Sequence, residues 1–385
     1  MSAAPPARPA AGAPRVAIVR GRYDPAGGAE RFVQGALAAL RAQGASVTIV
    51  ARQWPDHDGS AILIDPFHIG STWRDRAFAR AACAELARRR FDLVQSHERI
   101  ACCDVYRAGD GVHAQWLEER ARVRGPLGRL AIRLSPHHRY LLAAERALFA
   151  SPRLAAVICN SEMVRGEIAQ RFGVDAAKLV LIRNAVDTAH FHPGLRAGHR
   201  DEVRQQLGIP REARVALHVG SGFERKGVRA LLEALARAPS RPWAIVAGRD
   251  KHASRYQALA RRLGIAERVR FVGSVSDVRP YHAAADCFVL ATLYDPQPNA
   301  LLEAMASGLP VVTTHKCGGA ELVSEGSSGF VRDALDVAGI AEAIERMDPA
   351  GAARMGEAAR AAVLPYTPEA MAAEYVALYR RLLRR

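Results

Sequence analysis

Two carboxylates within residues 294–310 (YDPQPNALLEAMASGLP) are spaced to bind a ligand that is rich in hydroxyl groups. Asp295 follows a predicted buried strand, and Glu303 lies on the helix predicted just after it. Carboxylates accept hydrogen bonds from hydroxyls, which both a sugar and a ribose present in number. A surface loop followed by an exposed helical glutamate would give the same pattern, so the spacing alone leaves both interpretations open.

A basic loop, residues 218–227 (HVGSGFERKG), follows the first predicted strand of the C-terminal half. A diphosphate leaving group gains negative charge as its bond to a sugar breaks, and a catalyst must hold fixed cations against that charge. Arg225 and Lys226, in a loop flanked by glycines, are suited to this role. An ordinary basic turn before a helix is the alternative. Further along, residues 317–322 (CGGAEL) open a predicted helix, whose free N-terminal amides favour a phosphate.

Polar residues also follow predicted strands in the N-terminal half. Gly27 and Gly28, in residues 23–31 (YDPAGGAER), are predicted to face the donor phosphates, with a plain turn between a strand and a helix as the alternative. The run lacks the G-x-G-x-x-G pattern of dinucleotide-binding proteins. Asp110 and His113 lie in a predicted glycine-rich loop, residues 104–116 (DVYRAGDGVHAQW). They are predicted to bind an acceptor or to stabilise positive charge on the sugar, with a purely structural histidine as the alternative. The D-x-D of residues 55–59 (PDHDG) is interpreted as a turn, and no metal and no other cofactor are predicted.

These motifs together resemble those of the family 4 retaining glycosyltransferases. Residues 295–303 resemble the family's E-x7-E signature with aspartate in place of the first glutamate, and the accompanying A-x-G-x-P-V-V run follows. Residues 220–227 resemble the G-x-x-x-x-x-K-G phosphate loop, and residues 317–322 the G-G-x-x-E turn. Residues 23–31 and 183–193 (RNAVDTAHFHP) match two further family patterns, the second of which makes Asn184 and Asp187 mainly structural.

The resemblance, strongest to the lipopolysaccharide-core glucosyltransferases of this family, implies a role for each matching residue. It implies catalytic roles for Asp110, Arg225, Lys226 and Asp295, donor binding by Gly27, Gly28, Ser221, Asn299, Ala300, Leu301 and Glu303, and acceptor binding by His113. Glu303 would hold the ribose and Asp295 the donor sugar. The implied reaction moves a hexose, glucose from UDP-glucose, onto a lipopolysaccharide-core or similar glycolipid acceptor. Retention of configuration would follow from attack on the same face of the sugar, with the acceptor proton passing to a departing phosphate oxygen.

The elements that must position these motifs alternate between apolar β-branched runs and Ala/Leu-rich helices. This order predicts two parallel, doubly wound sheets, each Rossmann-like, facing each other across a cleft, which is the GT-B fold. The predicted strands comprise residues 15–19, 46–52, 91–97, 154–159 and 179–182 in the first half and 215–219, 243–247, 269–272, 287–291 and 310–313 in the second. We predict a flexible tail at 1–14, an acceptor-binding domain at 15–193, a nucleotide-sugar-binding domain at 194–366 and a helix at 367–385 that packs back toward the first domain.

Composition limits the partners of the chain. Its 385 residues are 49% hydrophobic and carry a formal net charge of +15, which attracts phosphates on a nucleotide or on a lipid headgroup. The basic residues form no dense cluster of the kind that nucleic-acid-binding proteins carry, so no nucleic acid is predicted. Residues 117–150 interleave arginines with leucines, which suits either a helix on the inner face of an anionic membrane or a solvated helical arm.

Six cysteines occur without a C-x-x-C pair or metal-ligand spacing, so all are predicted to be reduced thiols. With no apparent signal peptide, a cytoplasmic protein that associates peripherally with the inner membrane is predicted. Two other functions fit the same sequence. One is a nucleotide-sugar 2-epimerase of GT-B-like fold, which needs no acceptor, and the other is a non-catalytic protein that binds a nucleotide-sugar or a membrane.

Overall fold

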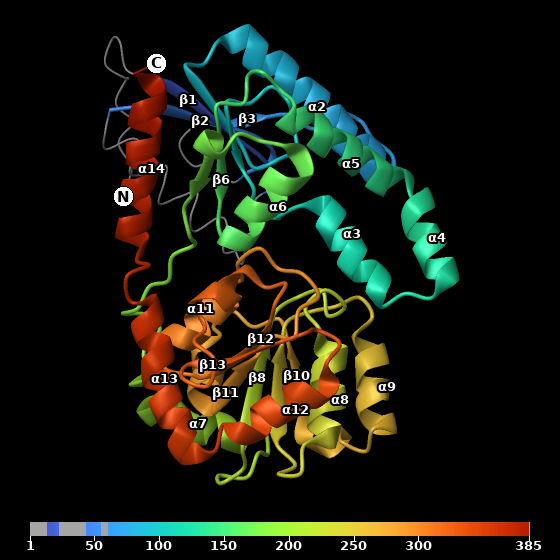
Figure 1. The fold of residues 1–385 in the computed structure, drawn as a ribbon, viewed down its shortest axis with the longest axis vertical. Helices are drawn as coiled ribbons and strands as arrows, with labels where there is room; N and C mark the ends of the chain where they lie inside the picture. Colours follow the sequence, from blue (N-terminus) through green and yellow to red (C-terminus); the bar gives the residue numbers. More distant parts are fainter. Residues whose placement is uncertain (1–13, 23–43, 55–60, 385) are drawn as a thin grey trace, which may run out of the picture. The chain divides into compact units, whose positions relative to one another are not determined.

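The computed structural model describes residues 14–22, 44–54 and 61–384, and the chain forms two compact units (Figure 1). Unit 1 comprises Met1–Arg183 and Pro368–Arg385, and unit 2 comprises Asn184–Thr367. The second unit therefore begins at Asn184, ahead of the predicted boundary at residue 194. In the part of the chain described, no helix is both long and apolar enough to cross a membrane.

Unit 1 is built on a parallel sheet with the strand order β3-β2-β1-β4-β5-β6-β7 (Figure 1). Every neighbouring pair runs in the same direction. Most of its strands are short runs of buried apolar residues, as expected for a sheet covered on both faces. The strands are β1 (Arg15–Arg22), β2 (Ser46–Gln53), β3 (Ala61–Leu63), β4 (Leu93–Ser96), β5 (Val105–Arg107), β6 (Ala156–Cys159) and β7 (Leu179–Leu181).

Helices cover both faces of this sheet. On one face, buried side chains of α2, α5 and α6 pack against alternate strand residues. On the other face, α14 inserts Tyr375, Leu378 and Tyr379 against the strands. The Tyr379 hydroxyl donates to the Gln95 side chain, and Arg107 Nε donates to the Tyr375 hydroxyl at 3.2 Å. The described helices are α2 (Gly70–Arg89), α3 (His113–Arg122), α4 (Pro126–Leu134), α5 (Pro136–Phe149), α6 (Glu162–Phe172) and α14 (Pro368–Leu383), with η1 (Ala176–Lys178) as a 3-10 turn.

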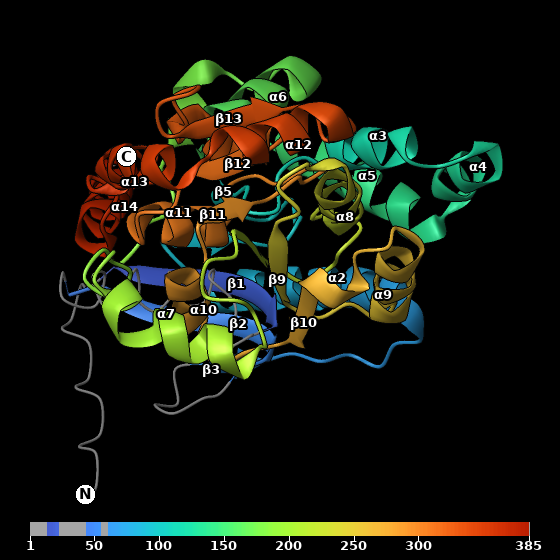
Figure 2. The same cartoon turned by 90° about the horizontal axis from the view of Figure 1, so that it is seen from below.

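Unit 2 repeats the plan with a parallel sheet in the order β10-β9-β8-β11-β12-β13. One apolar cluster packs α8, α9 and α12 on one face, and another packs α7, α10, α11 and α13 on the other (Figure 2). The strands are β8 (Val215–Val219), β9 (Trp243–Ala247), β10 (Val269–Gly273), β11 (Cys287–Val289), β12 (Val311–Thr314) and β13 (Gly329–Arg332). The helices are α7 (Leu195–Gln206), α8 (Val228–Arg237), α9 (Ala253–Arg262), α10 (Arg279–Ala284), α11 (Asn299–Ala306), α12 (Val337–Arg346) and α13 (Pro349–Val363), with 3-10 turns η2 (Ala266–Arg268) and η3 (Gly318–Leu322).

The predicted pair of parallel, doubly wound α/β domains is confirmed, although single elements differ. The sequence also predicts a helix at about 29–43, which lies outside the described residues. Strands β3, β5 and β13 were not expected, because each has only three or four residues, and β5 and β13 also contain an arginine or a glycine. The prediction of a loop throughout residues 104–116 is wrong in part, since β5 pairs with β4 and β6 and α3 begins at His113.

The prediction that all six cysteines are reduced is also wrong for one pair. Cys83 of α2 and Cys102, in the segment after β4, form a disulfide with their Cα atoms 5.8 Å apart. Their separation of 19 residues in sequence and the absence of a C-x-x-C pattern hid this pairing, which only the packing of α2 against the sheet brings together. Cys103, the immediate neighbour, is buried and unbonded.

Candidate active site

The candidate donor site lies at the carboxyl ends of three adjacent strands of unit 2. Because β8, β11 and β12 are parallel neighbours, the loops that follow them meet at one edge of the sheet. The loop after β8 carries the basic motif, and the loop after β11 carries Asp295. The Asp295 N–H donates to the Lys316 carbonyl, and the Gly318 N–H donates to the Asp295 carbonyl, both at 2.8 Å. The acidic motif and the glycine turn after β12 are therefore bonded together through their backbones.

Lys226 and Asp295 form an ion pair between the lysine ammonium and a carboxylate oxygen. The Lys226 side chain is 21% exposed and that of Asp295 is 8% exposed, so little water screens the pair. The sequence predicted one of these groups to bind phosphate and the other to bind sugar. The structure places the two in direct contact although 69 positions separate them.

Arg225 secures the basic loop against the end of β11. Its Nε donates to the Tyr294 carbonyl at 2.8 Å, and its guanidinium lies 5.7 Å from the centre of the Tyr294 ring. The Arg225 carbonyl accepts the Leu293 N–H and the Thr292 hydroxyl, each at 2.8 Å. Both its backbone and its side chain thus bind the segment that leads directly to Asp295.

Gly227 allows this close approach. It has a positive φ of 75° at the start of α8. A Cβ at this position would lie 1.7 Å from the Ala291 carbonyl oxygen, far inside any permitted contact. A side chain here would push the basic loop away from β11, so the glycine is required by geometry as well as by conformation.

Glu303, the second acid of the motif, lies on α11 and is 7% exposed. The segment between the two acids is fixed by Asn184. Its Nδ2 donates to the Gln297 carbonyl and to Asn299 Oδ1, each at 2.9 Å, and its N–H donates to Gln297 Oε1 at 2.5 Å. Asn184 thus shapes the entry to α11. Gln297 was not singled out from the sequence, because only its contacts with Asn184 show that it fixes the segment between the two acids.

The remaining predicted donor residues occupy different settings. Ser221 is exposed in the basic loop, where its Oγ accepts the Arg249 N–H at 3.1 Å. Ala300 is half-buried on α11. Leu301 is fully buried, and its side chain packs against Gly319. A Cβ added at Gly319 would lie only 2.4 Å from Leu301 Cδ2. The Leu301 side chain is therefore a core residue that does not reach a ligand surface. Gly27, Gly28 and the D-x-D of residues 55–59 lie outside the described residues.

In unit 1, a buried ion pair positions the loop that carries the other predicted residues. Arg99 Nε donates to Glu145 at 3.0 Å, and the Glu145 side chain is 1% exposed. Glu145 also accepts the His113 N–H at 2.6 Å and so caps the first turn of α3. Arg99 donates further to the Gly111 carbonyl at 3.2 Å, beside the exposed Asp110. Neither Arg99 nor Glu145 was identified from the sequence, because each looks like an ordinary residue on its own element.

His113 is nearly buried and pairs with a second histidine. Its Nε2 lies 3.2 Å from His138 Nδ1, and the Arg120 guanidinium lies 3.4 Å from the other nitrogen of His138. Burial, together with Arg120 and His137, lowers the pKa of His138, so this ring is neutral at pH 7. Asp110 thus lies in the loop after β5 and His113 at the first residue of α3, where contacts from α3 and α5 hold the polar groups.

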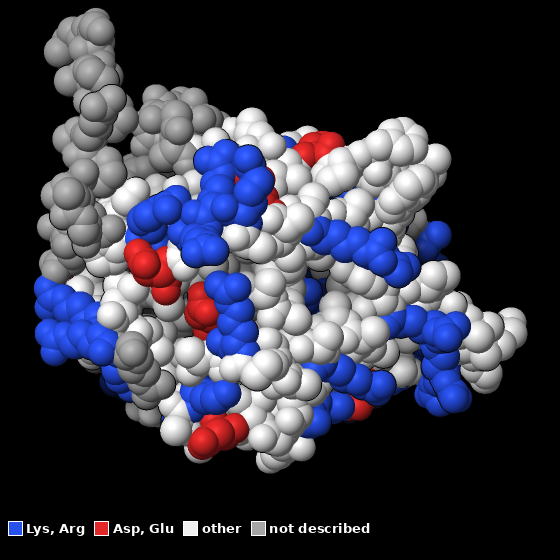
Figure 3. Space-filling view, turned by 90° about the horizontal axis from the view of Figure 1, so that it is seen from above, with Lys and Arg blue, Asp and Glu red and all other residues white. Residues whose placement is uncertain are grey.

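An amphipathic arm formed by α3, α4 and α5 exposes apolar side chains. None of the α4 residues is buried, and Leu127, Leu130 and Leu134 are 83%, 50% and 62% exposed. Arg129 and Arg133 lie on the same helix. Figure 3 shows Lys and Arg side chains prevailing over acidic ones on the face in view. Within the described segments, no three His, Cys, Asp or Glu side chains gather as a metal site would require.

Comparison with known proteins agrees with this geometry. Residues 26–190 match the glycosyltransferase family 4 and residues 199–362 match the glycosyl transferases group 1. The chain is 27% identical over 323 residues to the lipopolysaccharide glucosyltransferase WaaG of Escherichia coli K12, covering 82% of this chain and 84% of that protein. It is 38% identical over 145 residues to the lipopolysaccharide core biosynthesis glycosyltransferase LpsE of Rhizobium meliloti, covering 37% of this chain and 42% of that protein.

Solved structures give the same picture of the fold. The crystal structure of WaaG matches with a TM-score of 0.80 at 25% identity, covering 93% of this chain and 98% of that one. The Anabaena protein HepE in complex with UDP-glucose matches with a TM-score of 0.73 at 20% identity, covering 95% and 99% of the two chains. The second match is a likeness of fold.

Proposed function

Because the chain is a glycosyltransferase of the GT-B fold that resembles the lipopolysaccharide-core enzymes, we propose that it transfers glucose from UDP-glucose to a lipopolysaccharide-core or similar glycolipid acceptor. One observation carries the proposal. The Lys226 ammonium and the Asp295 carboxylate are paired at the carboxyl edge of the unit 2 sheet, next to a glycine turn. A cation can bind the phosphate oxygens of a sugar diphosphate, and a carboxylate can accept hydrogen bonds from its hydroxyls.

Donor binding would replace the internal ion pair by contacts to the ligand. The diphosphate oxygens take over Lys226, with Arg225 beside it, and Asp295 turns to hydroxyls of the donor sugar. Glu303 accepts the ribose hydroxyls, while Ser221, Asn299, Ala300 and the backbone at Leu301 line the rest of the site. The pairing of Lys226 with Asp295 before binding holds both side chains in place.

The proposed reaction retains the configuration of the sugar and uses no metal. The acceptor hydroxyl oxygen forms a bond to the anomeric carbon on the face from which the bond to the diphosphate oxygen breaks. The hydroxyl proton passes to the departing phosphate oxygen, so no separate protein base is required. Lys226 and Arg225 stabilise the charge that develops on the diphosphate, which is the largest contribution expected from the protein.

Acceptor binding is assigned to unit 1. Asp110 in the loop after β5 and His113 at the start of α3 are both positioned by the Arg99–Glu145 pair, and Asp110 is exposed. The apolar side chains of α4, flanked by arginines, suit an arm that lies on the anionic inner surface of a membrane. A lipid-linked acceptor in that surface would be presented to this unit by the same contact.

Calorimetric titration with UDP-, GDP- and ADP-glucose tests the donor assignment. We expect saturable binding of UDP-glucose and weaker binding of the other two, with binding of UDP-glucose weakened in Lys226→Ala and preserved in Lys251→Ala, an exposed lysine of the same unit. Preference for GDP- or ADP-glucose would overturn the donor. UDP release in the absence of any acceptor, with conversion of the sugar to its 2-epimer, would instead favour an epimerase.

A further inference from the structure

A second cavity in unit 2 lies at the opposite edge of the sheet from the donor site. It has a volume of about 430 Å³ and is lined by residues that directly precede strands, namely Arg214 before β8, Asp286 before β11 and Leu309 close before β12. The donor motifs follow the other ends of these same strands. A ligand in this cavity is therefore separated from the donor by the length of the sheet.

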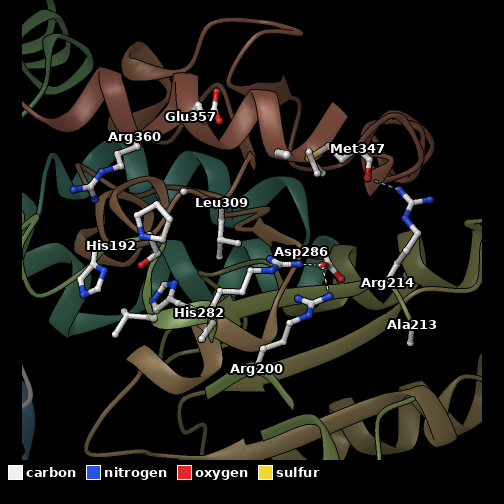
Figure 4. Close-up of a pocket in the computed structure, with 18 of the residues that line it drawn as sticks. His192, Arg200, Ala213, Arg214, His282, Asp286, Leu309, Met347, Glu357 and Arg360 are labelled. Carbon is white, nitrogen blue, oxygen red and sulfur yellow. Dashed lines mark hydrogen bonds and ion pairs between the residues drawn. The ribbon is translucent and has the colours of Figure 1, made fainter. Parts of the chain in front are cut away.

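The cavity is rich in arginine. Five arginines and three carboxylates line it (Arg196, Arg200, Arg211, Arg214 and Arg360, with Asp286, Glu212 and Glu357). Figure 4 shows Arg200 reaching Asp286 on one side, while Glu357 and Arg360 come from α13 on the other. Arg211 and Arg214 pair with Asp201 and Glu345, which lie outside the lining. The excess of positive charge therefore lies with Arg196 and Arg200, and it favours an anion.

One carboxylate in the cavity is shared by three guanidinium groups. Arg196, Arg200 and Arg204 each donate to Asp286 at 2.8 Å. Although burial acts in the other direction, Arg200 and Arg204 hold the pKa of Asp286 below its ordinary value, so the group is ionised. A single negative charge cannot neutralise three positive ones. Arg196 is 47% and Arg200 20% exposed, so both can offer further N–H donors to a ligand.

A buried histidine in the same wall has unmet hydrogen-bonding capacity. His282 lines the cavity and is 1% exposed, and neither of its ring nitrogens has a hydrogen-bond partner among the described residues. Burial lowers its pKa to about 3, so the ring is neutral and offers one donor and one acceptor. A buried polar group without a partner is costly, and a ligand that pairs with it would regain that free energy.

The remaining wall suits a small organic body. Leu195, Leu309 and Met347 contribute apolar surface beside the charged groups, and Ser307 contributes a hydroxyl. A volume of this size is within the range of small-molecule sites and exceeds what an inorganic anion needs.

We propose that this cavity binds a small phosphorylated metabolite, with the phosphate group held by Arg196 and Arg200 and the organic body against the wall that includes His282. Guanidinium groups bind phosphate through paired, charge-assisted hydrogen bonds, which matches a pair of arginines one helical turn apart on α7. The ligand would contact both α7 and α13 and is distinct from the donor substrate. This inference does not depend on which sugar the enzyme transfers.

Calorimetric titration of the full chain tests the inference, with UDP present in excess so that the donor site is filled. The probes are glucose 6-phosphate, glycerol 3-phosphate and 3-phosphoglycerate, with inorganic phosphate and glucose as comparisons. We expect at least one phosphorylated probe to bind about tenfold or more tightly than inorganic phosphate, and glucose not to bind. Absence of saturable binding by all three probes up to about 10 mM, or equal binding of inorganic phosphate, would overturn the proposal.

Two variants locate the binding. Arg196→Ala removes a guanidinium that would donate hydrogen bonds to the phosphate. Ala353→Glu adds a negative charge at an exposed position of the cavity wall and leaves every contact of Asp286 in place. Each should weaken binding of the probe by roughly tenfold or more, since the first removes a charge-assisted hydrogen bond to the phosphate and the second places a like charge near it. The control Arg255→Ala, an exposed arginine on α9, should leave it unchanged. Unchanged affinity in Ala353→Glu, a variant that keeps every arginine, would contradict the site.

Discussion

The ammonium of Lys226 and the carboxylate of Asp295 are ion-paired at the carboxyl edge of the unit 2 sheet, with both side chains largely shielded from water. They come from two motifs that follow two adjacent parallel strands, β8 and β11. Each side chain holds the other in a fixed position. A diphosphate sugar entering this edge meets a cation and a carboxylate that are already aligned, so little reorganisation is needed in the reaction.

Replacing the lysine should remove most of the catalytic effect of this edge. We expect Lys226→Ala to lower kcat by about 10²- to 10³-fold, the magnitude typical for the loss of one group that stabilises developing negative charge. The matched control Lys251→Ala should keep normal turnover. Steady-state assays of UDP release, with urea unfolding to verify the fold of each variant, measure both effects. Turnover in Lys226→Ala within a few-fold of the native enzyme would remove the lysine from the mechanism.

Two glycines of the basic loop separate conformational strain from steric conflict. Gly227 and Gly222 have nearly the same φ, 75° and 77°, but only at Gly227 would a Cβ meet a carbonyl oxygen, at 1.7 Å. Gly222→Ala should therefore cost about 1 kcal/mol of unfolding free energy from backbone strain alone. Gly227→Ala should cost about 3 kcal/mol or more and also lower activity, because the loop must move away from β11. Equal unfolding free energies for the two variants would show that the contact with Ala291 is not close.

The Arg99–Glu145 pair should matter far more than an exposed ion pair of the same unit. Arg99→Met leaves the Glu145 carboxylate buried without its charged partner, which is expected to cost about 3–5 kcal/mol of stability. Arg165→Met removes an exposed pair with Glu162, where both side chains are more than two-fifths exposed, and should change stability by less than about 1 kcal/mol. Urea unfolding of both variants measures the difference. A cost for Arg99→Met as small as that for Arg165→Met would mean that the pair does not organise the Asp110 loop.

The exposed leucines of α4 should determine binding to anionic vesicles. The triple variant Leu127→Ser, Leu130→Ser, Leu134→Ser removes apolar surface worth roughly 1.5–3 kcal/mol for each side chain that enters the lipid. We expect its affinity for vesicles, measured by co-sedimentation, to fall by about 100-fold or more, while turnover with a deacylated, water-soluble acceptor stays normal. The control Leu335→Ser, Leu364→Ser changes two leucines of unit 2 that are 43% and 44% exposed. Equal loss of vesicle binding in the control would rule out a specific role for the arm.

The sequence predicts the sheets well because their strands carry a direct physical signal. Runs such as residues 215–219 (VALHV) and 243–247 (WAIVA) are largely apolar and each is followed by a glycine, and both become strands of the buried sheet. Short strands give no such signal. Residues 105–107 (VYR) end in an arginine, and only pairing with both neighbours makes them a strand.

For the candidate site, too, the sequence predicts some features, while others depend on contacts that only the structure shows. Motif spacing and strand order are enough to expect the basic loop and the acidic motif at one edge of the sheet. Motif spacing cannot predict the contact between Lys226 and Asp295, because this contact requires the basic loop to approach β11 closely at Gly227, where a side chain would not fit. The arginine-rich cavity is hidden for another reason, since its lining comes from α7, α10, α13 and the segments between them, which share no motif. The Cys83–Cys102 pair likewise depends on helix packing and not on spacing.

Product analysis tests directly whether the chain transfers glucose from UDP-glucose with retention of configuration. The purified chain is incubated with UDP-glucose and a lipopolysaccharide core that ends at the inner-core heptoses, and the product is examined by proton NMR. We expect a new glucosyl residue on the acceptor with the α configuration of the donor, one UDP released for each glucose transferred, and no product in Lys226→Ala. A β-linked product would contradict the same-face reaction, and the absence of transfer with UDP-glucose would contradict the proposed function itself.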